Sequence, residues 1–319
     1  MYRRILVPLD GSALGERVLS YVRLLGKRLG SPISLLMVVE RPAPSVSADL
    51  NPALYQHMTL KYKVKKAREY LGWVATGLRD EGLEVSSVVR EGKPVARIVE
   101  EADREPETLI ALSSHGRSGL SRFWLGSVTD HVLHHTDKPL LIVGPHDPNA
   151  EVGEVRLERE IIALDGTGVA EQMLTHAVMV AKALELKTTL VRVTPAAGLY
   201  YYPEAKEQDG ESDIPGDLDT RALGYLDEVR DFLRRQSVRS MEDHVLHGYP
   251  VSTTLISFAR ENPGSLLAVA THGRSGLTRG LLGSVVDNLI RLSGHPVLVL
   301  RVADHSSRKE LEAKAADRA

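Results

Sequence analysis

The 319-residue sequence contains no cysteine. Disulfides, thiolate nucleophiles and cysteine-ligated metals are therefore excluded for this chain. No apolar run reaches the length of a membrane span. The apolar stretch that follows Arg3 and Arg4 ends at Pro8 and Asp10, which is too short for a signal peptide. We therefore expect a cytoplasmic protein with no membrane partner.

The chain also lacks an excess of charge of either sign. Its 40 basic and 42 acidic residues leave a formal net charge of −2, and 43% of its residues are hydrophobic. These values are ordinary for a globular protein and do not favour a nucleic-acid partner. The length is about twice that of a common domain, which predicts two domains.

The two halves of the sequence resemble each other. RRILVPLDGS matches REIIALDGTG, and SSHGRSGLSRFWLGS matches ATHGRSGLTRGLLGS. The offset is 155 between Asp10 and Asp165 and 157 between Gly116 and Gly273. A nearly constant offset across separate matches indicates one domain that was duplicated.

The boundary between the copies is predicted in the polar, turn-rich segment 144–158. The predicted domains span residues 1–147 and 156–303, and residues 304–319 form a charged tail. An insertion after the second strand of the second copy carries Tyr200, Tyr201 and Tyr202. These tyrosines either cover a site or belong to an insertion without that role.

In each copy, short apolar strands alternate with amphipathic helices. Ile5 to Leu9 is such a strand, and Val18, Val22 and Leu25 follow at helical spacing. This alternation predicts an α/β fold with a doubly wound parallel sheet that helices cover on both faces.

The repeated glycine-rich phrase is predicted to lead from a strand into a helix. Gly116 and Gly119 would let the backbone approach a ligand, and Gly126 with Ser127 would begin the helix. Such a helix start favours anions. Arginines at matching places in the two copies suit phosphate: Arg117, Arg122, Arg274 and Arg279. The alternative is a capping box of Ser127 with Asp130, and of Ser284 with Asp287.

The loop after the first strand carries an aspartate in both copies, Asp10 and Asp165. If strands one and four are neighbours, this loop and the glycine phrase face one crevice beyond the strand ends. An aspartate there could accept a hydrogen bond from an adenine amine or a ribose hydroxyl. The alternative is an Asx-turn that opens the first helix.

Several catalytic patterns are incomplete. The P-loop ending and the last glycine of the dinucleotide fingerprint are missing, and GRSGL is out of register for a nucleophile elbow. A triad of Ser12, His115 and Asp10 is not favoured, because Asp10 and Ser12 share one tight turn. His131, His134 and His135 have the spacing of a metal face, but a solvated helix face is favoured. No catalytic residue and no metal site are predicted.

With these residues in hand, both halves resemble the universal stress protein family in its tandem form. The family's nucleotide pattern is G-x2-G-x9-G-[ST]. Its last three elements match at Gly116 with Gly126-Ser127, and at Gly273 with Gly283-Ser284. Ser113 and Ala270 replace the first glycine.

This resemblance implies, for each domain, five parallel strands in the order 3-2-1-4-5 and a bound adenine nucleotide, ATP or else AMP or ADP, with which Mg²⁺ could enter. By the resemblance, Asp10 and Val38, or Asp165 and Val193, meet the adenosine, and the glycine loops take ribose and phosphates. The predicted set of the first domain is Pro8, Asp10, Ser12, Val38, Ser113, Gly116, Arg117, Gly119, Gly126, Ser127 and Val128. The predicted set of the second domain is Ala163, Asp165, Thr167, Val193, Ala270, Gly273, Arg274, Gly276, Gly283, Ser284 and Val285.

The leading hypothesis is a nucleotide-binding stress or regulatory protein that signals to a protein partner. Competing hypotheses are a scaffold or chaperone-like protein that has lost nucleotide binding and, less favoured, a weak ATP hydrolase. We expect the copies to pair as an intramolecular pseudo-dimer through their closing strands, 138–143 and 296–302, with a homodimer as a further option. If only one copy holds nucleotide, Pro8 favours the first, because Ala163 in the second copy is less rigid.

Overall fold

The computed structural model describes residues 2–41, 52–114, 125–144, 147, 155–195, 215–273 and 283–303. The chain divides into two compact units, Met1–Val155 and Arg156–Ala319.

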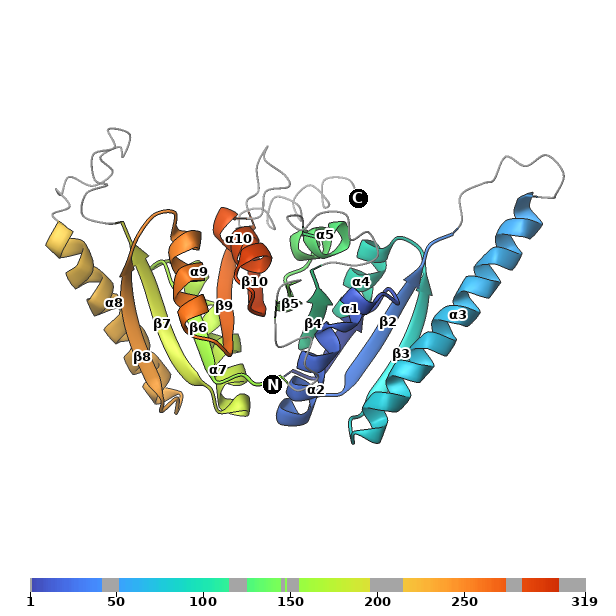
Figure 1. The fold of residues 1–319 in the computed structure, drawn as a ribbon, viewed down its shortest axis with the longest axis horizontal. Helices are drawn as coiled ribbons and strands as arrows, with labels where there is room; N and C mark the ends of the chain where they lie inside the picture. Colours follow the sequence, from blue (N-terminus) through green and yellow to red (C-terminus); the bar gives the residue numbers. More distant parts are fainter. Residues whose placement is uncertain are drawn as a thin grey trace, which may run out of the picture. The chain divides into compact units, whose positions relative to one another are not determined.

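The first unit alternates strands and helices (Figure 1). Its elements are β1 (Arg4–Pro8), α1 (Ala13–Glu16), α2 (Val18–Leu29), β2 (Ile33–Val39), α3 (Pro52–Asp80), β3 (Val85–Glu91), α4 (Pro94–Asp103), β4 (Thr108–Ser113), α5 (Ser127–His135) and β5 (Leu140–Val143).

The strands of the first unit are all parallel, in the order β3-β2-β1-β4-β5. Pro8 of β1 is in register with Leu36 of β2, and Leu6 is in register with Ile110 of β4. The expected order 3-2-1-4-5 is therefore confirmed for this unit. The winding direction changes between β1 and β4, which places a crevice at the carboxyl ends of these strands.

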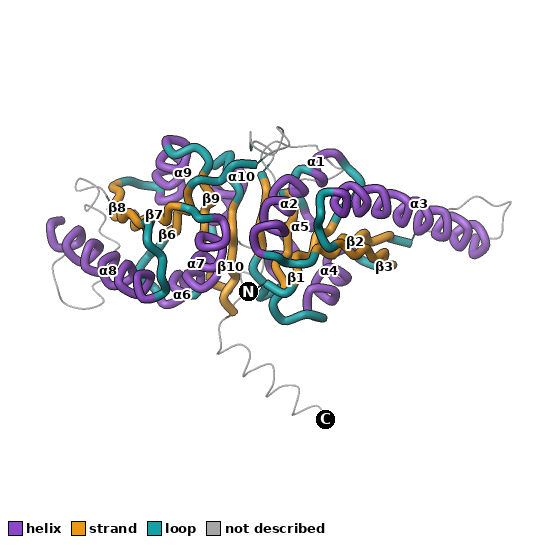
Figure 2. Tube along the Cα trace, turned by 90° about the horizontal axis from the view of Figure 1, so that it is seen from below, coloured by secondary structure: helices purple, strands orange, loops and turns teal. Residues whose placement is uncertain are grey.

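Helices cover both faces of this sheet. α2 and α3 pack on one face, and α4 packs against α5 on the other. Figure 2 shows α3 and α4 on opposite sides of β2 and β3. The core residues of β1, β4 and β5 are fully buried, whereas Ser86 and Ser87 of the edge strand β3 are exposed.

Local signals explain where the helices begin and end. The hydroxyl of Ser12 accepts a hydrogen bond from the Gly15 amide and caps α1. α2 ends at Gly30, whose φ of 62° is readily adopted by glycine. α4 begins with Pro94, which needs no amide partner there.

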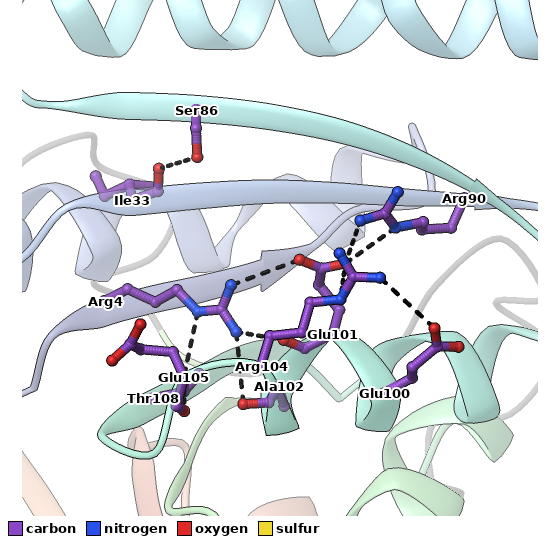
Figure 3. Close-up of polar contacts among 10 residues, drawn as sticks. All are labelled: Arg4, Ile33, Ser86, Arg90, Glu100, Glu101, Ala102, Arg104, Glu105 and Thr108. Atoms are coloured by element: carbon purple, nitrogen blue, oxygen red, sulfur yellow. Dashed lines mark hydrogen bonds and ion pairs between the residues drawn. The ribbon is translucent and has the colours of Figure 1, made fainter.

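A buried carboxylate, that of Glu101 on α4, joins three elements of the first unit (Figure 3). It pairs with Arg4 of β1 at 3.5 Å, with Arg90 of β3 at 2.9 Å and with Arg104 at 3.5 Å. Arg4 also donates to the hydroxyl of Thr108 at 3.1 Å. The side chain of Glu101 is only 8% exposed, so its charge depends on these guanidinium groups.

The second unit repeats the same sequence of elements. They are β6 (Arg159–Ala163), α6 (Gly168–Glu171), α7 (Met173–Leu184), β7 (Lys187–Thr194), α8 (Pro215–Arg235), β8 (Met241–His247), α9 (Val251–Glu261), β9 (Ser265–Gly273), α10 (Ser284–Leu292) and β10 (Val297–Ala303). Its parallel strands follow the order β8-β7-β6-β9-β10, which again confirms 3-2-1-4-5. Figure 2 shows α8 and α9 on opposite sides of β7 and β8.

The second unit buries a glutamate at a position where the first unit buries an isoleucine. Glu160 is the second residue of β6 and is fully buried, as is Ile5, the second residue of β1. Neither carboxyl oxygen of Glu160 has a hydrogen-bond partner among the residues that the structure describes. Burial raises the pKa of this carboxyl well above its ordinary value of 4.5.

In the described part of the chain, no helix is long and apolar enough to cross a membrane.

Candidate functional site

A cavity of about 730 Å³ opens in the first unit at the carboxyl ends of β1, β2 and β4. Pro8 ends β1, Val38 and Val39 end β2, and Ser113 ends β4, and all four line the cavity. This is the place where the winding direction of the sheet changes. Ligands of doubly wound sheets bind at that place, and the volume suits a small organic ligand.

One wall of the cavity is the turn that follows β1. Asp10 Oδ1 accepts hydrogen bonds from the Ser12 amide at 2.9 Å and from the Ser12 hydroxyl at 2.7 Å. The Ser12 hydroxyl in turn accepts from the Gly15 amide at 3.0 Å. The Asx-turn expected as an alternative is therefore confirmed, and it holds the carboxyl group of Asp10 in the cavity lining.

Gly11 and Gly15 let this turn stay tight. Gly11 has a φ of 81°, which disfavours any other residue. A Cβ atom on Gly15 would lie 2.5 Å from Asp10 Oδ1 and 3.1 Å from the Ser12 hydroxyl. A side chain at position 15 would therefore crowd the Asp10 carboxyl group in its present place.

The opposite wall is the start of α5, where Gly126, Ser127, Val128 and Thr129 line the cavity. The Thr129 hydroxyl donates to the Ser113 carbonyl at 2.9 Å and fixes the first turn of α5 against the end of β4. The amides of a first helical turn lack partners within their helix, and the helix dipole there favours an anion.

The capping-box alternative is wrong in both units. Gly126 and Gly283 occupy the N-cap positions of α5 and α10, and no side chain caps either helix. Ser127 and Ser284 are instead the first helical residues. The motif S-x-x-D is compatible with a serine at the N-cap or at the first helical position, so the motif alone does not identify the cap. The backbone of Gly126 (φ −56°, ψ 136°) and of Gly283 (φ −52°, ψ 128°) is not helical, which places the N-cap at these glycines.

A third wall comes from α3, which sequence reasoning missed. The cavity is lined there by Tyr62, Lys63, Lys66, Ala67 and Tyr70. Tyr62, Lys66 and Tyr70 recur at intervals of four residues and so share one helix face. That spacing in the segment after the second strand is the signal that could have revealed this wall. Pro94 and Ile98 of α4 add apolar lining.

Polar groups near this wall are paired. The hydroxyl of Tyr70 donates to Glu16 Oε1 at 2.8 Å. Lys66 donates to Glu69 at 3.0 Å, and this hydrogen bond and the charge of Glu69 raise the pKa of Lys66. Lys63 and Lys66 are the positively charged residues of this wall.

The structure brings together many of the residues predicted for the first domain. Around this one cavity lie Pro8, Asp10, Val38, Ser113, Gly126, Ser127 and Val128. Ser12 acts through its hydrogen bonds to Asp10. Gly116, Arg117, Gly119 and Arg122 lie outside the described residues, as does His115.

The second unit repeats the aspartate turn. Asp165 Oδ1 accepts from the Thr167 amide at 2.9 Å and from its hydroxyl at 2.6 Å. Ala163 ends β6, and Val193 is the last residue but one of β7. Asp165 is exposed, whereas Asp10 is half-buried.

The remaining predicted residues of the second domain lie on β9, at the start of α10, or outside the described residues. Ala270 lies within β9, which ends at Gly273, and Gly283, Ser284 and Val285 open α10. Arg274, Gly276, Arg279 and the tyrosines Tyr200 to Tyr202 lie outside the described residues, as does the tail 304–319.

The histidines of α5 make local contacts. His131 and His135 bond through Nδ1 to the carbonyl oxygens of Ser127 and His131, at 2.6 and 2.7 Å. His134 lies 3.6 Å from Asp130. Within the described ranges, no three histidine, aspartate or glutamate side chains converge as metal ligands.

Comparison with known proteins relates both units to one family. The model of the universal stress protein family matches residues 1–144 and 158–301. A universal stress protein of Mycolicibacterium smegmatis is 24% identical over 309 residues, which cover 93% of this chain and 96% of that protein. A universal stress protein of Methanocaldococcus jannaschii is 30% identical over 154 residues, which cover 45% of this chain and 95% of that protein.

A solved structure has the same fold over nearly the whole chain. The crystal structure of a universal stress protein from Archaeoglobus fulgidus matches with a TM-score of 0.69 at 22% identity. The match covers 94% of this chain and 99% of that one.

Proposed function

The chain belongs to the universal stress protein family, and we propose that its first domain binds an adenine nucleotide as a regulatory ligand. The observation that carries this proposal is the cavity of about 730 Å³, which joins the Asp10 turn to the first turn of α5. One ligand with a flat polar base at one end and phosphate at the other would satisfy both walls.

The base end suits adenine. Leu36, Val38 and Ile98 give apolar lining, and Asp10 lines the same cavity. A carboxylate in that position accepts a hydrogen bond from an exocyclic amine or from ribose hydroxyls. The Ser12 bonds hold this acceptor in place before the ligand arrives, which lowers the ordering cost of binding.

The phosphate end suits an anion. Ser127 and Val128 of the first helical turn line the cavity, and α5 is long enough, at nine residues, to support a helix dipole. Magnesium would enter with the polyphosphate, because the described residues hold no cluster of three histidine or acidic ligands for an ion alone.

The role that fits such a site is regulation. The bound nucleotide would change the surface that the first domain offers to a protein partner in the cytoplasm, where adenine nucleotides are abundant. A scaffold that has lost nucleotide binding is the competing function. Weak ATP hydrolysis is a lesser alternative, since Ser12, the hydroxyl nearest the aspartate, is already engaged by Asp10 and the Gly15 amide.

Calorimetry on the full chain tests the proposal. We expect ATP to bind with micromolar affinity, about 8 kcal/mol. Asp10→Ala should weaken binding at least tenfold, because it removes the acceptor at the base end. Asp165→Ala is the matched control and should leave the affinity unchanged.

Two results would contradict the proposal. Absence of heat, together with an unchanged melting temperature at millimolar ATP, would favour the scaffold. Loss of binding in Asp165→Ala but not in Asp10→Ala would assign the site to the second domain. Mass spectrometry of small molecules released from the purified chain would identify the native ligand.

A further inference from the structure

Three residues at the proposed base end of the first-domain cavity, its base-binding corner, have counterparts in the second unit. Gly11, Met37 and Tyr70 line the cavity of the first unit. Gly166 follows Asp165 as Gly11 follows Asp10. In register, Met37 follows Leu36, the partner of Pro8, and Arg192 follows Val191, the partner of Ala163. Arg192 of β7 therefore stands where β2 has Met37.

Tyr225 of α8 is the counterpart of Tyr70 of α3. Tyr70 donates to Glu16, the last residue of α1. Tyr225 has a buried hydroxyl and lies beside Glu171, the last residue of α6. Burial and then the Glu171 charge raise the pKa of the Tyr225 phenol above its ordinary value of 10.0. The phenol therefore stays neutral at physiological pH.

The guanidinium group of Arg192 spans this corner. Both of its terminal nitrogens lie 3.2 Å from the place where a Cβ atom on Gly166 would be. Its central carbon lies 5.2 Å from the centroid of the Tyr225 ring. It thus touches the glycine of the aspartate turn on one side and the tyrosine of the long helix on the other.

A planar cation over an aromatic ring is a stable arrangement, and the guanidinium group has roughly the thickness and planarity of a nucleobase. The carboxylates of Glu171 and Asp165 interact electrostatically with the same tyrosine. Their negative charge attracts the guanidinium group of Arg192 to this place. In the first unit, Gly11, Met37 and Tyr70 all line the open cavity, and Met37 is buried.

We propose that Arg192 closes the base-binding corner of the second domain, so that the chain takes one adenine nucleotide, in the first domain. This inference rests on the function proposed above for the first domain. It makes residue 37 or 192 the position that decides whether a copy accepts the base. The start of α10, with Gly283 at its N-cap, retains the form of the α5 start, so the obstruction is confined to the base end.

Exchange of the two residues tests the proposal. Calorimetry with ATP on the full chain should give one site per chain for the unaltered protein and two for Arg192→Met, which copies the first domain. Met37→Arg should lower the affinity of the first site at least tenfold. Arg234→Met removes an exposed arginine of α8, the helix that carries Tyr225, and should leave one site.

Each outcome decides the matter. Two sites in the unaltered chain, or no gain of a site in Arg192→Met, would overturn the role of Arg192. No site in the unaltered chain but one in Arg192→Met would support that role and refute binding by the first domain. Met37 is buried, so circular dichroism should first establish that Met37→Arg folds. If it does not fold, Arg192→Met alone decides.

Discussion

The hydroxyl of Tyr70 donates a hydrogen bond to Glu16 Oε1 at 2.8 Å. This bond joins the middle of α3 to the end of α1, across 54 residues of sequence. Tyr70 also lines the cavity, so the bond sets how far the wall from α3 stands from the Asp10 turn.

We predict that Tyr70→Phe weakens ATP binding several-fold while it leaves the fold intact. The ring still lines the cavity, but the bond to Glu16 is lost, at a cost of about 1 kcal/mol. Calorimetry measures the affinity. Tyr249→Phe makes the same change on a ring that is 75% exposed in the second unit and should have no effect. An equal loss in both variants would contradict the role given to the bond.

Gly15→Ala should weaken ATP binding roughly tenfold, about 1.4 kcal/mol. The added Cβ atom would lie 2.5 Å from Asp10 Oδ1, so the turn around the carboxyl group must shift. The second unit has Ala170 at this position, and there the amide-to-hydroxyl bond is 3.3 Å instead of 3.0 Å. Ala170→Gly is the matched control and should leave the affinity unaltered. Full affinity in Gly15→Ala would show that Asp10 tolerates displacement.

Glu101→Gln should destabilise the first unit by about 3–5 kcal/mol, because it leaves three guanidinium groups facing a neutral amide. Both tryptophans of the chain, Trp73 and Trp124, belong to the first unit, so a change in tryptophan fluorescence during urea unfolding comes from this unit. Glu107→Gln breaks an exposed ion pair with Arg3 and should cost at most about 1 kcal/mol. Similar costs for the two variants would argue against a special role of Glu101.

The stability of the second unit should fall as pH rises. The folded chain holds the Glu160 proton more tightly than the unfolded chain, because burial raises the pKa of Glu160 above 4.5. The stabilisation is complete below that ordinary value and is lost as pH rises through the folded pKa. Scanning calorimetry from about pH 5 to pH 8 measures this loss.

Two variants control for other groups in the pH experiment. Glu160→Gln removes the titration and retains the shape, so its second-unit transition should vary less with pH. Glu160→Ile copies Ile5 of the first unit and should raise stability at neutral pH. A pH dependence that persists unchanged in Glu160→Gln would assign it to another group.

The fold was predictable because each strand and helix occurs in both copies of the duplicated sequence, so each pattern could be checked twice. The strand order followed from the resemblance to the family. Part of the cavity was predictable for a related reason. Asp10 and Gly126 follow neighbouring parallel strands, and the carboxyl ends of such strands meet. The four-residue spacing of Tyr62, Lys66 and Tyr70 marks one face of α3, but the spacing alone does not say that this face borders the crevice. That placement depends on the packing of α3 on β2 and β3.

Arg192 was beyond sequence reasoning for a different reason. Its meaning depends on the register between β6 and β7 and on the neighbouring Tyr225, and neither is visible in a strand pattern. Glu160 is a similar case, since nothing adjacent to it in the sequence signals burial without a partner. The pairing of the two copies stays a prediction.

Under this proposal, the contact between Arg192 and Tyr225 would also determine how the chain responds to changing nucleotide levels. A protein with two equal sites can couple them and switch over a narrow range of ligand concentration. If Arg192 fills the crevice of the second domain, as proposed, the chain would have a single saturable site, and the occupancy of that site would follow a simple hyperbola. Its occupancy would therefore rise gradually with the concentration of adenine nucleotide. A switch over a narrow range of concentration would require association with another molecule.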